Sequence, residues 1–225
     1  MASDGTTANE FPRIGMTTAE QVVADLRRRI LLGELVPGQR LKIDEIATLC
    51  GVSHMPVRTA LQDLEAEGIL IVHSRRGAEI RTIDSHYITN VLEVRGAVEA
   101  MLAGKCAEMI QSEDAVTLRN LATTFEEKAK IATPQELLQA NFKLHNFINC
   151  IPNNSEAIFT LNRGRLLIET LRVRAGYGGT RIDAIIAEHR QLVDAICAHD
   201  QVAARGISQS HCDSARDELL KLVGS

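Results

Sequence analysis

The 225-residue sequence has no apolar run that approaches the length of a membrane span, although 45% of its residues are hydrophobic. A transmembrane helix needs about 20 consecutive apolar residues, so we expect a globular protein that makes no use of a membrane. Residues 1–12 are rich in polar and small residues and lack both a basic start and an apolar core, which excludes a secretion signal. We predict that residues 1–14 form a flexible tail and that the protein is cytoplasmic.

Two further kinds of motif are missing. The five cysteines are odd in number and form no C-x-x-C pair, so reduced and mostly buried thiols are expected, as in a cytoplasmic protein. The sequence also contains neither an H-E-x-x-H motif nor a nucleophile elbow. The absence of both motifs disfavours a hydrolase.

A positive net charge is absent as well, since the formal value is −4. The acidity is unevenly placed: residues 13–82 hold ten Lys/Arg and nine Asp/Glu, whereas residues 84–225 hold 15 and 18. The length allows two modest domains, and we place them at residues 15–83 and 84–225. Any binding to nucleic acid would then depend on local clusters such as Arg58 and Arg75-Arg76, doubled by dimerisation.

Residues 53–68 predict a short helix with a signal at each end. Ser53 is suited to cap the first turn, Pro56 falls where a missing N–H costs little, and Gly68 suits a left-handed residue. An apolar stripe recurs at helical spacing in Val57, Ala60, Leu61 and Leu64, and the polar side chains His54, Arg58, Thr59 and Gln62, with Met55, lie off it. A helix with one buried stripe and a polar leading end suits insertion into the major groove of DNA.

The flanking segments complete a larger motif. Residues 43–49 predict another short helix, and Gly51-Val52 makes a tight turn into Ser53, which gives a helix-turn-helix pattern. Residues 69–72 and 78–82 predict two strands around a basic turn, a hairpin wing. A small helical core followed by an ordinary hairpin is the alternative, and the two arginines at the wing tip argue against it.

The first helix is expected upstream of this motif. Thr17 and Glu20 form a capping box that opens a helix to about Gly33. The run Arg27-Arg28-Arg29 of this helix would either contact DNA phosphates or form a solvent-exposed face.

These motifs resemble the winged-helix domain of GntR-family transcription regulators over about residues 17–83. The resemblance is carried by the segments Leu35–Leu41, Val52–Leu61, Glu67–Leu70 and Arg76-Gly77. It implies that DNA is contacted by Arg40, Ser53, His54, Met55, Arg58, Arg75, Arg76 and Gly77. The family usually has arginine where this chain has His54, and a largely neutral imidazole gives up the bidentate contact to guanine. The operator sequences of relatives therefore do not carry over.

Beyond residue 85 the sequence has no alternating run and no hairpin turn, and each segment predicts a helix. Helices are expected at about residues 87–109, 112–131, 134–150 and 154–175, from Thr180, and from Asp200 to about Val223. Six antiparallel helices form a bundle. The predicted fold class is therefore mainly α, an N-terminal winged helix-turn-helix with a small β-hairpin wing followed by an all-α bundle.

Three histidines stand on apolar faces of three different predicted helices: His145, His189 and His211. A single buried histidine is usually a hydrogen-bonded core residue. Three that all face inward favour a ligand set, because facing helices of a bundle commonly build metal sites. Asn141 lies one helical turn before His145, so its amide oxygen could be a weak fourth ligand.

This half of the chain resembles the second domain of the FadR subfamily of GntR regulators, the helical FCD type. The matching pieces are residues 141–145, Glu188-His189 with Ala195-Ile196, and Asp200 with Ala203-Ala204 and His211. The resemblance implies that the histidines bind a divalent metal ion, zinc in the first place, with nickel or manganese as alternatives. The family usually has aspartate where this chain has Asn141, and losing that charge would weaken the site.

Arg95 lies among the apolar residues of its predicted helix. One interpretation is an internal ion pair with Glu99, four residues on. The other is capture of a ligand carboxylate by a desolvated guanidinium, and the FCD resemblance favours it. Arg172 is a second candidate, and Asn141 belongs to the same predicted effector site.

The sequence therefore predicts a homodimeric transcription regulator, a repressor, that binds double-stranded DNA at a palindromic operator and responds to a small organic acid bound near the metal. Two alternatives stay open. A metal-dependent hydrolase would need a carboxylate general base facing the metal, and Glu188 adjoins His189 but points about 100° away. A purely metal-responsive regulator would have no organic effector, and the metal ion alone would change its binding to DNA.

Overall fold

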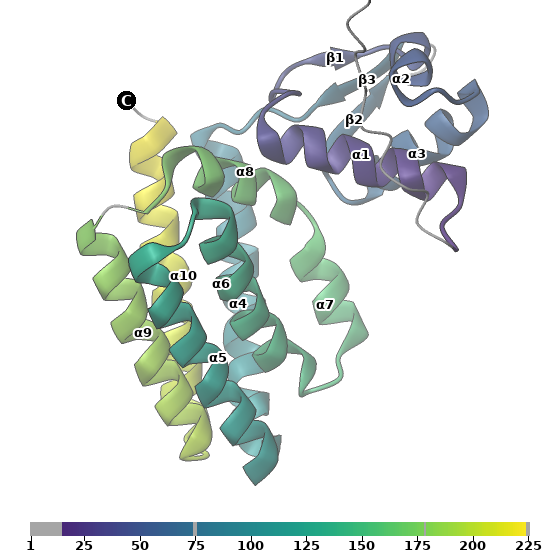
Figure 1. Cartoon of the computed structure of the whole chain (residues 1–225). Coiled ribbons are helices and arrows are strands. Elements are labelled where there is room, and N and C mark those ends of the chain that lie inside the picture. Colours follow the sequence, from purple (N-terminus) through teal and green to yellow (C-terminus); the bar gives the residue numbers. More distant parts are fainter. Residues whose placement is uncertain (1–14, 74–75, 178, 224–225) are drawn as a thin grey trace, which may run out of the picture.

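The computed structural model describes residues 15–73, 76–177 and 179–223, so the predicted tail at residues 1–14 lies outside the described residues. Figure 1 shows a small part with a sheet and a larger all-helical part. The small part consists of α1 (Thr18–Leu32), β1 (Arg40–Leu41), α2 (Ile43–Cys50), α3 (His54–Ala66), β2 (Leu70–His73) and β3 (Gly77–Ile80). The larger part consists of α4 (Ser85–Met109), α5 (Ser112–Ile131), α6 (Pro134–Cys150), α7 (Ser155–Asn162), α8 (Arg165–Ala175), α9 (Gly179–Cys197) and α10 (Gln201–Val223). The predicted fold class is confirmed.

Local signals set the limits of α1 as the sequence predicted. The Thr17 hydroxyl accepts a hydrogen bond from the Glu20 backbone N–H at 3.2 Å, and the Glu20 carboxylate accepts one from the Thr17 backbone N–H at 2.6 Å. Gly33 ends the helix in the left-handed conformation with φ 76°, where glycine has no Cβ to clash. The buried face of α1 packs with the stripe of α3 in one aliphatic core that contains Val22, Val23, Leu26, Ile30, Val57, Ala60, Leu61 and Leu64.

The start of α3 differs from the expectation in one detail. Ser53 occupies the cap position in an extended conformation, but its side chain makes no capping hydrogen bond. The sequence removes one of the two usual donors: a capping hydroxyl accepts from the second or third helical N–H, and the third helical residue is Pro56, which has none. The Ser53 side chain is therefore exposed and not engaged in capping.

The wing is a three-stranded sheet in the order β1-β3-β2. Antiparallel β2 and β3 pair as predicted, with Leu70 opposite Ile80, and the unforeseen strand β1 places Arg40 opposite Glu79. A Cβ on Gly77 would lie 2.1 Å from the Leu41 carbonyl oxygen. The close approach of β1 and β3 therefore requires glycine at position 77.

The bundle has seven helices among the described residues, where six were predicted. The expected single helix from residue 154 to residue 175 is two helices, α7 and α8, because Gly164 has φ 72°. A left-handed residue interrupts the helical path, and the apolar pattern on either side of it concealed the break. Within the described residues, no helix combines the length and apolar character needed to span a bilayer.

Helix α8 joins the bundle to the small part, and Figure 1 shows it beside α1. The Leu167 side chain is fully buried in the aliphatic core of the small part. At the start of α8, the Gly164 N–H donates a hydrogen bond to the Glu67 carbonyl oxygen at 2.8 Å. The two parts therefore share one packed contact in addition to the chain connection at residues 81–84.

We expect Leu167→Ala to destabilise the protein, although residue 167 lies outside the small part that it helps to fill. A buried Leu→Ala change leaves a cavity and costs about 2–5 kcal/mol. Urea unfolding followed by circular dichroism should show a lower midpoint for this variant. Leu32→Ala is the matched control, because Leu32 is 51% exposed and its loss should cost little. Equal midpoints for the two variants would contradict the shared core.

Candidate functional site

The outer face of α3 is polar and exposed. His54, Arg58, Thr59 and Gln62 all face solvent, and Met55 is 71% exposed, while the opposite stripe lies in the core. The His54 Nε2 atom lies 3.0 Å from the Asp44 carboxylate of α2, and both side chains are largely exposed. Among the described residues, no acidic side chain is paired with Arg58. This face therefore offers one uncompensated cation near the leading end of the helix.

The arginines of the small part fall into two groups. Arg27 pairs with Glu67, and Arg28 and Arg29 pair with Asp25 and Glu34, at distances of 2.7–3.2 Å for the last two arginines. The Arg27-Arg28-Arg29 run is therefore compensated within this part of the chain.

Arg40 and Arg76 belong to the second group. The Arg40 side chain is 82% exposed and lies 3.8 Å from Glu79, too long for a hydrogen bond, and Arg76 is exposed beside the buried Gly77. Arg75 lies outside the described residues. The exposed arginines of the small part without a hydrogen-bonded acidic partner among the described residues are thus Arg58 on α3, Arg40 on β1 and Arg76 just before β3.

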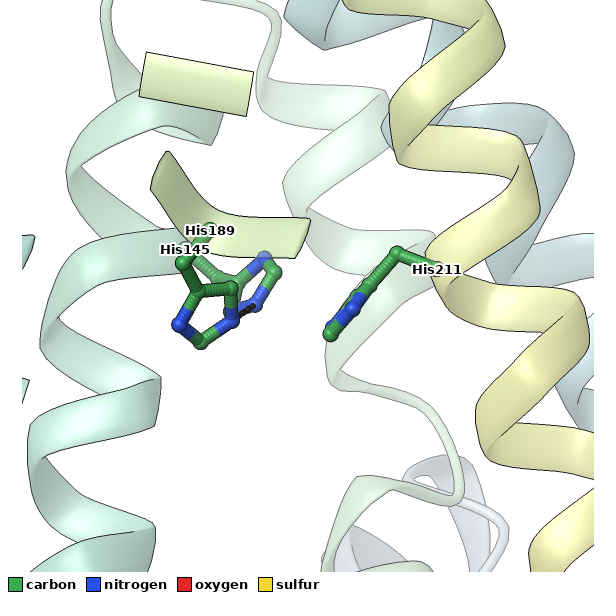
Figure 2. Close-up of side chains that lie close together, drawn as sticks. All are labelled: His145, His189 and His211. Carbon is green, nitrogen blue, oxygen red and sulfur yellow. Dashed lines mark hydrogen bonds between the residues drawn. The ribbon is translucent and has the colours of Figure 1, made fainter. Parts of the chain in front are cut away.

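The three predicted histidines meet inside the bundle (Figure 2). His145 comes from α6, His189 from α9 and His211 from α10, and their ring centroids are 5.0–5.1 Å apart. The two Nε2 atoms of His145 and His189 are 3.1 Å apart. Each residue offers a ring nitrogen within 4.8 Å of the others, and all three residues are at most 9% exposed. The sequence prediction that these faces converge is confirmed.

Burial keeps two of these imidazoles uncharged. It lowers the pKa of His145 to about 4, an effect that the nearby Glu99 carboxylate partly offsets. The pKa of His189 lies well below its usual value, because of burial first and the neighbouring His211 and His145 second. A neutral imidazole is the form that binds a metal ion. The cluster therefore has the chemistry of a ligand set for a divalent transition metal.

A carboxylate fixes the third ring. The Glu188 Oε2 atom lies 2.5 Å from His211 Nδ1, so the other ring nitrogen of His211 is directed elsewhere. This carboxylate–histidine arrangement is typical of the surroundings of metal sites. Arg181 in turn donates to Glu188 at 2.7 Å and to Glu218 at 3.1 Å. Glu188 thus acts on the histidine of α10 and not on its sequence neighbour His189.

A cavity of about 100 Å³ adjoins the histidines. Its lining includes His145, His211, Asn141, Arg95 and Arg172, so the structure brings these predicted effector and metal residues together. His189 is not a lining residue; its ring packs against Phe125, with the ring centroids 4.6 Å apart. Neutral Asn141 is half-buried and stands where the resembled family usually has aspartate.

Both predicted arginines have internal partners. The Arg95 guanidinium lies 2.9 Å from the buried Glu99 carboxylate, which also accepts from the Cys212 thiol at 3.1 Å. Burial acts against ionisation of Glu99, but Arg95 and then the histidines outweigh it and hold its pKa at about 2. Arg172 lies 2.7 Å from Glu218. Of the two alternatives for Arg95, the ion pair with Glu99 occurs, and capture of a ligand carboxylate stays a prediction for a residue that also lines the cavity.

Glu188 and Glu218 were not predicted as parts of this site. A signal existed for Glu188: it stands seven residues after Arg181, which is two helical turns, so the two side chains share a face of α9. No such signal existed for Glu218, because its partners Arg172 and Arg181 lie on other helices.

The chain matches two family descriptions. Residues 18–80 match "Bacterial regulatory proteins, gntR family", and residues 90–214, more than half of the chain, match the FCD domain. The chain belongs to the GntR family. Its FCD domain fits the FadR subfamily that the sequence resemblance indicated.

Relatives of this GntR protein are regulators from several bacteria. It is 24% identical over 186 residues to the uncharacterized HTH-type transcriptional regulator YdhC of Bacillus subtilis, covering 82% of this chain and 83% of the relative. It is 25% identical over 195 residues to the probable D-xylose utilization operon transcriptional repressor of Paenarthrobacter nicotinovorans, covering 87% and 85%.

Solved structures show the same fold. Escherichia coli McbR/YncC superposes with a TM-score of 0.77 at 18% identity, over 92% of this chain and 99% of that one. A putative GntR regulator from Rhodococcus sp. RHA1 gives a TM-score of 0.69 at 20% identity, over 92% and 99%. This GntR protein is accordingly a DNA-binding transcription regulator and not an enzyme. The hydrolase alternative is therefore set aside.

We expect the metal-free protein to lose stability as the pH falls from 6.5 towards about 4. The pKa of His145 is lowered from 6.5 to about 4, so in this window the unfolded chain binds more protons than the folded protein. A shift of this size corresponds to about 3 kcal/mol. Thermal unfolding in the presence of a chelator should show a steep loss for the wild type and a shallower one for His145→Gln. His86→Gln, at an exposed histidine, should follow the wild type, and identical slopes for all three proteins would refute the assignment.

Proposed function

We propose that this GntR regulator is a homodimeric repressor that binds a palindromic operator through α3 and the wing. The proposal is supported by the exposed polar face of α3 and by the exposed cations Arg40, Arg58 and Arg76. Residues 13–82 carry a charge close to zero, so a dimer that doubles these contacts would gain much of its affinity from the second copy. Two relatives are named repressors, one from Escherichia coli and the D-xylose operon repressor.

We place the boundary between the DNA-binding and FCD domains at residues 83–84, between the sheet and α4. DNA contacts are proposed for Ser53, His54, Met55, Arg75 and Gly77 as well, with Gly77 acting through the shape of the wing and not through a side chain. The site of action would be the cytoplasm, where the DNA of a bacterium lies.

We infer that His145, His189 and His211 hold a divalent metal ion, zinc in the first place and nickel or manganese as alternatives. The donor set supports this inference, because three buried imidazoles from three helices converge and Glu188 orients one of them. Asn141 lines the same cavity and would be a weak fourth ligand through its amide oxygen. A bound ion would supply local positive charge and coordination positions for a ligand.

The proposed effector is a small organic acid that enters the cavity beside the histidines. Arg95 is its main candidate partner, since its guanidinium lines that cavity, although Glu99 neutralises it and Leu161 accepts a long hydrogen bond from it at 3.3 Å. Arg172 is the second candidate. The acid would change DNA affinity by as much as its affinities for the two arrangements differ.

We expect Arg58→Ala to abolish specific DNA binding while the protein stays folded. Each bidentate base contact is worth about 1–3 kcal/mol of discrimination, and a dimer would lose two. The operator can be selected from random duplexes by the wild-type protein and then used in a mobility-shift assay. Arg119→Ala removes the same charge from a half-exposed arginine of α5, paired with Asp194, and should bind normally. Unchanged affinity of the Arg58 variant would exclude α3 as the reading element.

Metal content provides the second test. His189→Ala should lose the ion, measured by elemental analysis after loading with zinc and dialysis, because one of three ligands is gone. Asn141→Asp should retain zinc more tightly, since it adds a negative charge at the cavity, and exposed His86→Ala should not differ from the wild type.

A wild type that takes up neither zinc, nickel nor manganese would refute the metal proposal, and the histidines would then be hydrogen-bond partners of the effector. Titration with metal alone, and with metal plus candidate acids, distinguishes the remaining alternative. Release of DNA by metal alone would indicate a purely metal-responsive regulator.

A further inference from the structure

A second, larger cavity lies between the DNA-binding domain and the bundle. Its volume is about 510 Å³. Gly68 and Arg81 line it from the DNA-binding domain, Tyr87 from the first turn of α4, and Arg163 and Gly164 from the turn between α7 and α8. We call this space the interdomain cavity. It is distinct from the histidine cavity, and Arg95 is a lining residue of both.

The arginines of the two cavities differ in their partners. In the histidine cavity each guanidinium is neutralised by a carboxylate, through the pairs Arg95–Glu99, Arg165–Glu169, Arg172–Glu218 and Arg181–Glu188. Within the described residues, neither Arg81 nor Arg163 has such a partner. The Arg81 Nε–H donates to the Gly68 carbonyl oxygen at 3.2 Å, which leaves its positive charge uncompensated.

The acidic residue Asp84 also lines the interdomain cavity, but it is already engaged. Its carboxylate accepts the Tyr87 backbone N–H at 2.7 Å and so caps α4. This bond to a neutral N–H leaves the charge of Asp84 in place, so the interdomain cavity holds the two unpaired guanidiniums of Arg81 and Arg163 and one carboxylate.

A third hydrogen-bond donor of the interdomain cavity belongs to Tyr87. The Tyr87 hydroxyl is buried and has no hydrogen-bond partner among the described residues, which is costly for a polar group. It lies against Gly164, where a Cβ would come within 2.6 Å of it. Burial raises the pKa of Tyr87 to about 12, although Arg81 and Arg163 act in the opposite direction. The phenol is therefore a neutral O–H donor at physiological pH, close to both arginines.

We propose that the interdomain cavity binds the phosphate group of a small anionic ligand. Two guanidiniums and one phenol supply donors from three separate segments, and a tetrahedral, doubly charged group can accept from all three directions. A planar carboxylate has two oxygens and one charge, so it would satisfy this wall less well. The ligand would neutralise Arg81 and Arg163, and a shift of the Tyr87 side chain that exposes its buried hydroxyl would give that group the acceptor that it lacks.

Because the donors belong to both domains, a bound phosphate would hold the DNA-binding domain against the turn between α7 and α8. It would thus act on the orientation of the two domains by a route that is independent of the histidine metal site. The effect of phosphate on DNA binding cannot exceed the difference in phosphate affinity between the two orientations.

The test uses the full chain, treated with a chelator so that no metal ion at the histidines can bind phosphate. Inorganic phosphate is titrated by calorimetry at constant ionic strength, and one site per chain is expected. Arg81→Gln and Arg163→Gln should each weaken binding about tenfold or more, as expected for bonds to a charged group. Tyr87→Phe removes one hydroxyl and should weaken binding about fivefold.

Two controls make the result specific. Arg119→Gln removes an equal charge from the surface of α5, and His189→Ala disturbs the histidine cluster, and both should bind phosphate as the wild type does. Hydrogen exchange should show protection at residues 81–87 and 160–164 when phosphate is added to the wild type, and no protection in Tyr87→Phe.

Four results would overturn the proposal. The wild type could fail to bind phosphate, or all variants could bind it equally. Acetate could bind as tightly as phosphate with the same sensitivity to the variants, which would make the cavity a carboxylate site. Finally, Arg81→Gln and Arg163→Gln could weaken binding to the selected operator in phosphate-free buffer, which would identify both arginines as contacts to DNA.

Discussion

The burial of three imidazole rings in one small space is the constraint on which the helical domain depends. Rings 5.0–5.1 Å apart can share such a space only while most of them carry no charge, and every charged group nearby is matched by an opposite one. Glu99 is balanced by Arg95, and Glu188 by Arg181. Helices α4, α6, α9 and α10 are therefore held together by a polar centre as well as by aliphatic packing. Such a centre is sensitive to any ligand that changes its charge.

The connection between the two domains follows from a single residue. Gly164 ends one helical path and starts another, and its N–H donates to the Glu67 carbonyl oxygen at the end of α3. Leu167 follows on α8 and fills the core of the DNA-binding domain. The same turn also presents Arg163 to the interdomain cavity. The start of α8 is thus in direct contact with the end of α3, the helix that carries Arg58.

Signals that act within a few residues were readable from the sequence. The capping box at Thr17, the stripe of α3 and the inward faces of the histidine helices all follow from helical spacing, and they gave the fold class and the histidine cluster. Partners from different helices were not readable. The bond from Glu188 to His211 depends on how α9 packs against α10, and β1 is too short to show a period. Gly164 was visible as a residue, but glycine within an apolar pattern does not distinguish an interrupted helix from a continuous one.

The proline in the first turn of α3 has a further consequence for how this protein can evolve. Because Pro56 offers no N–H to Ser53, the fold gains little from the side chain at position 53. The helix start is secured instead by the packing of Val57 and Ala60, which are fully buried. Position 53 can therefore accept other side chains at a small cost in folding stability. Mutation can therefore change the side chain at the leading end of α3, where we propose contact with DNA, while the scaffold that presents it stays unchanged.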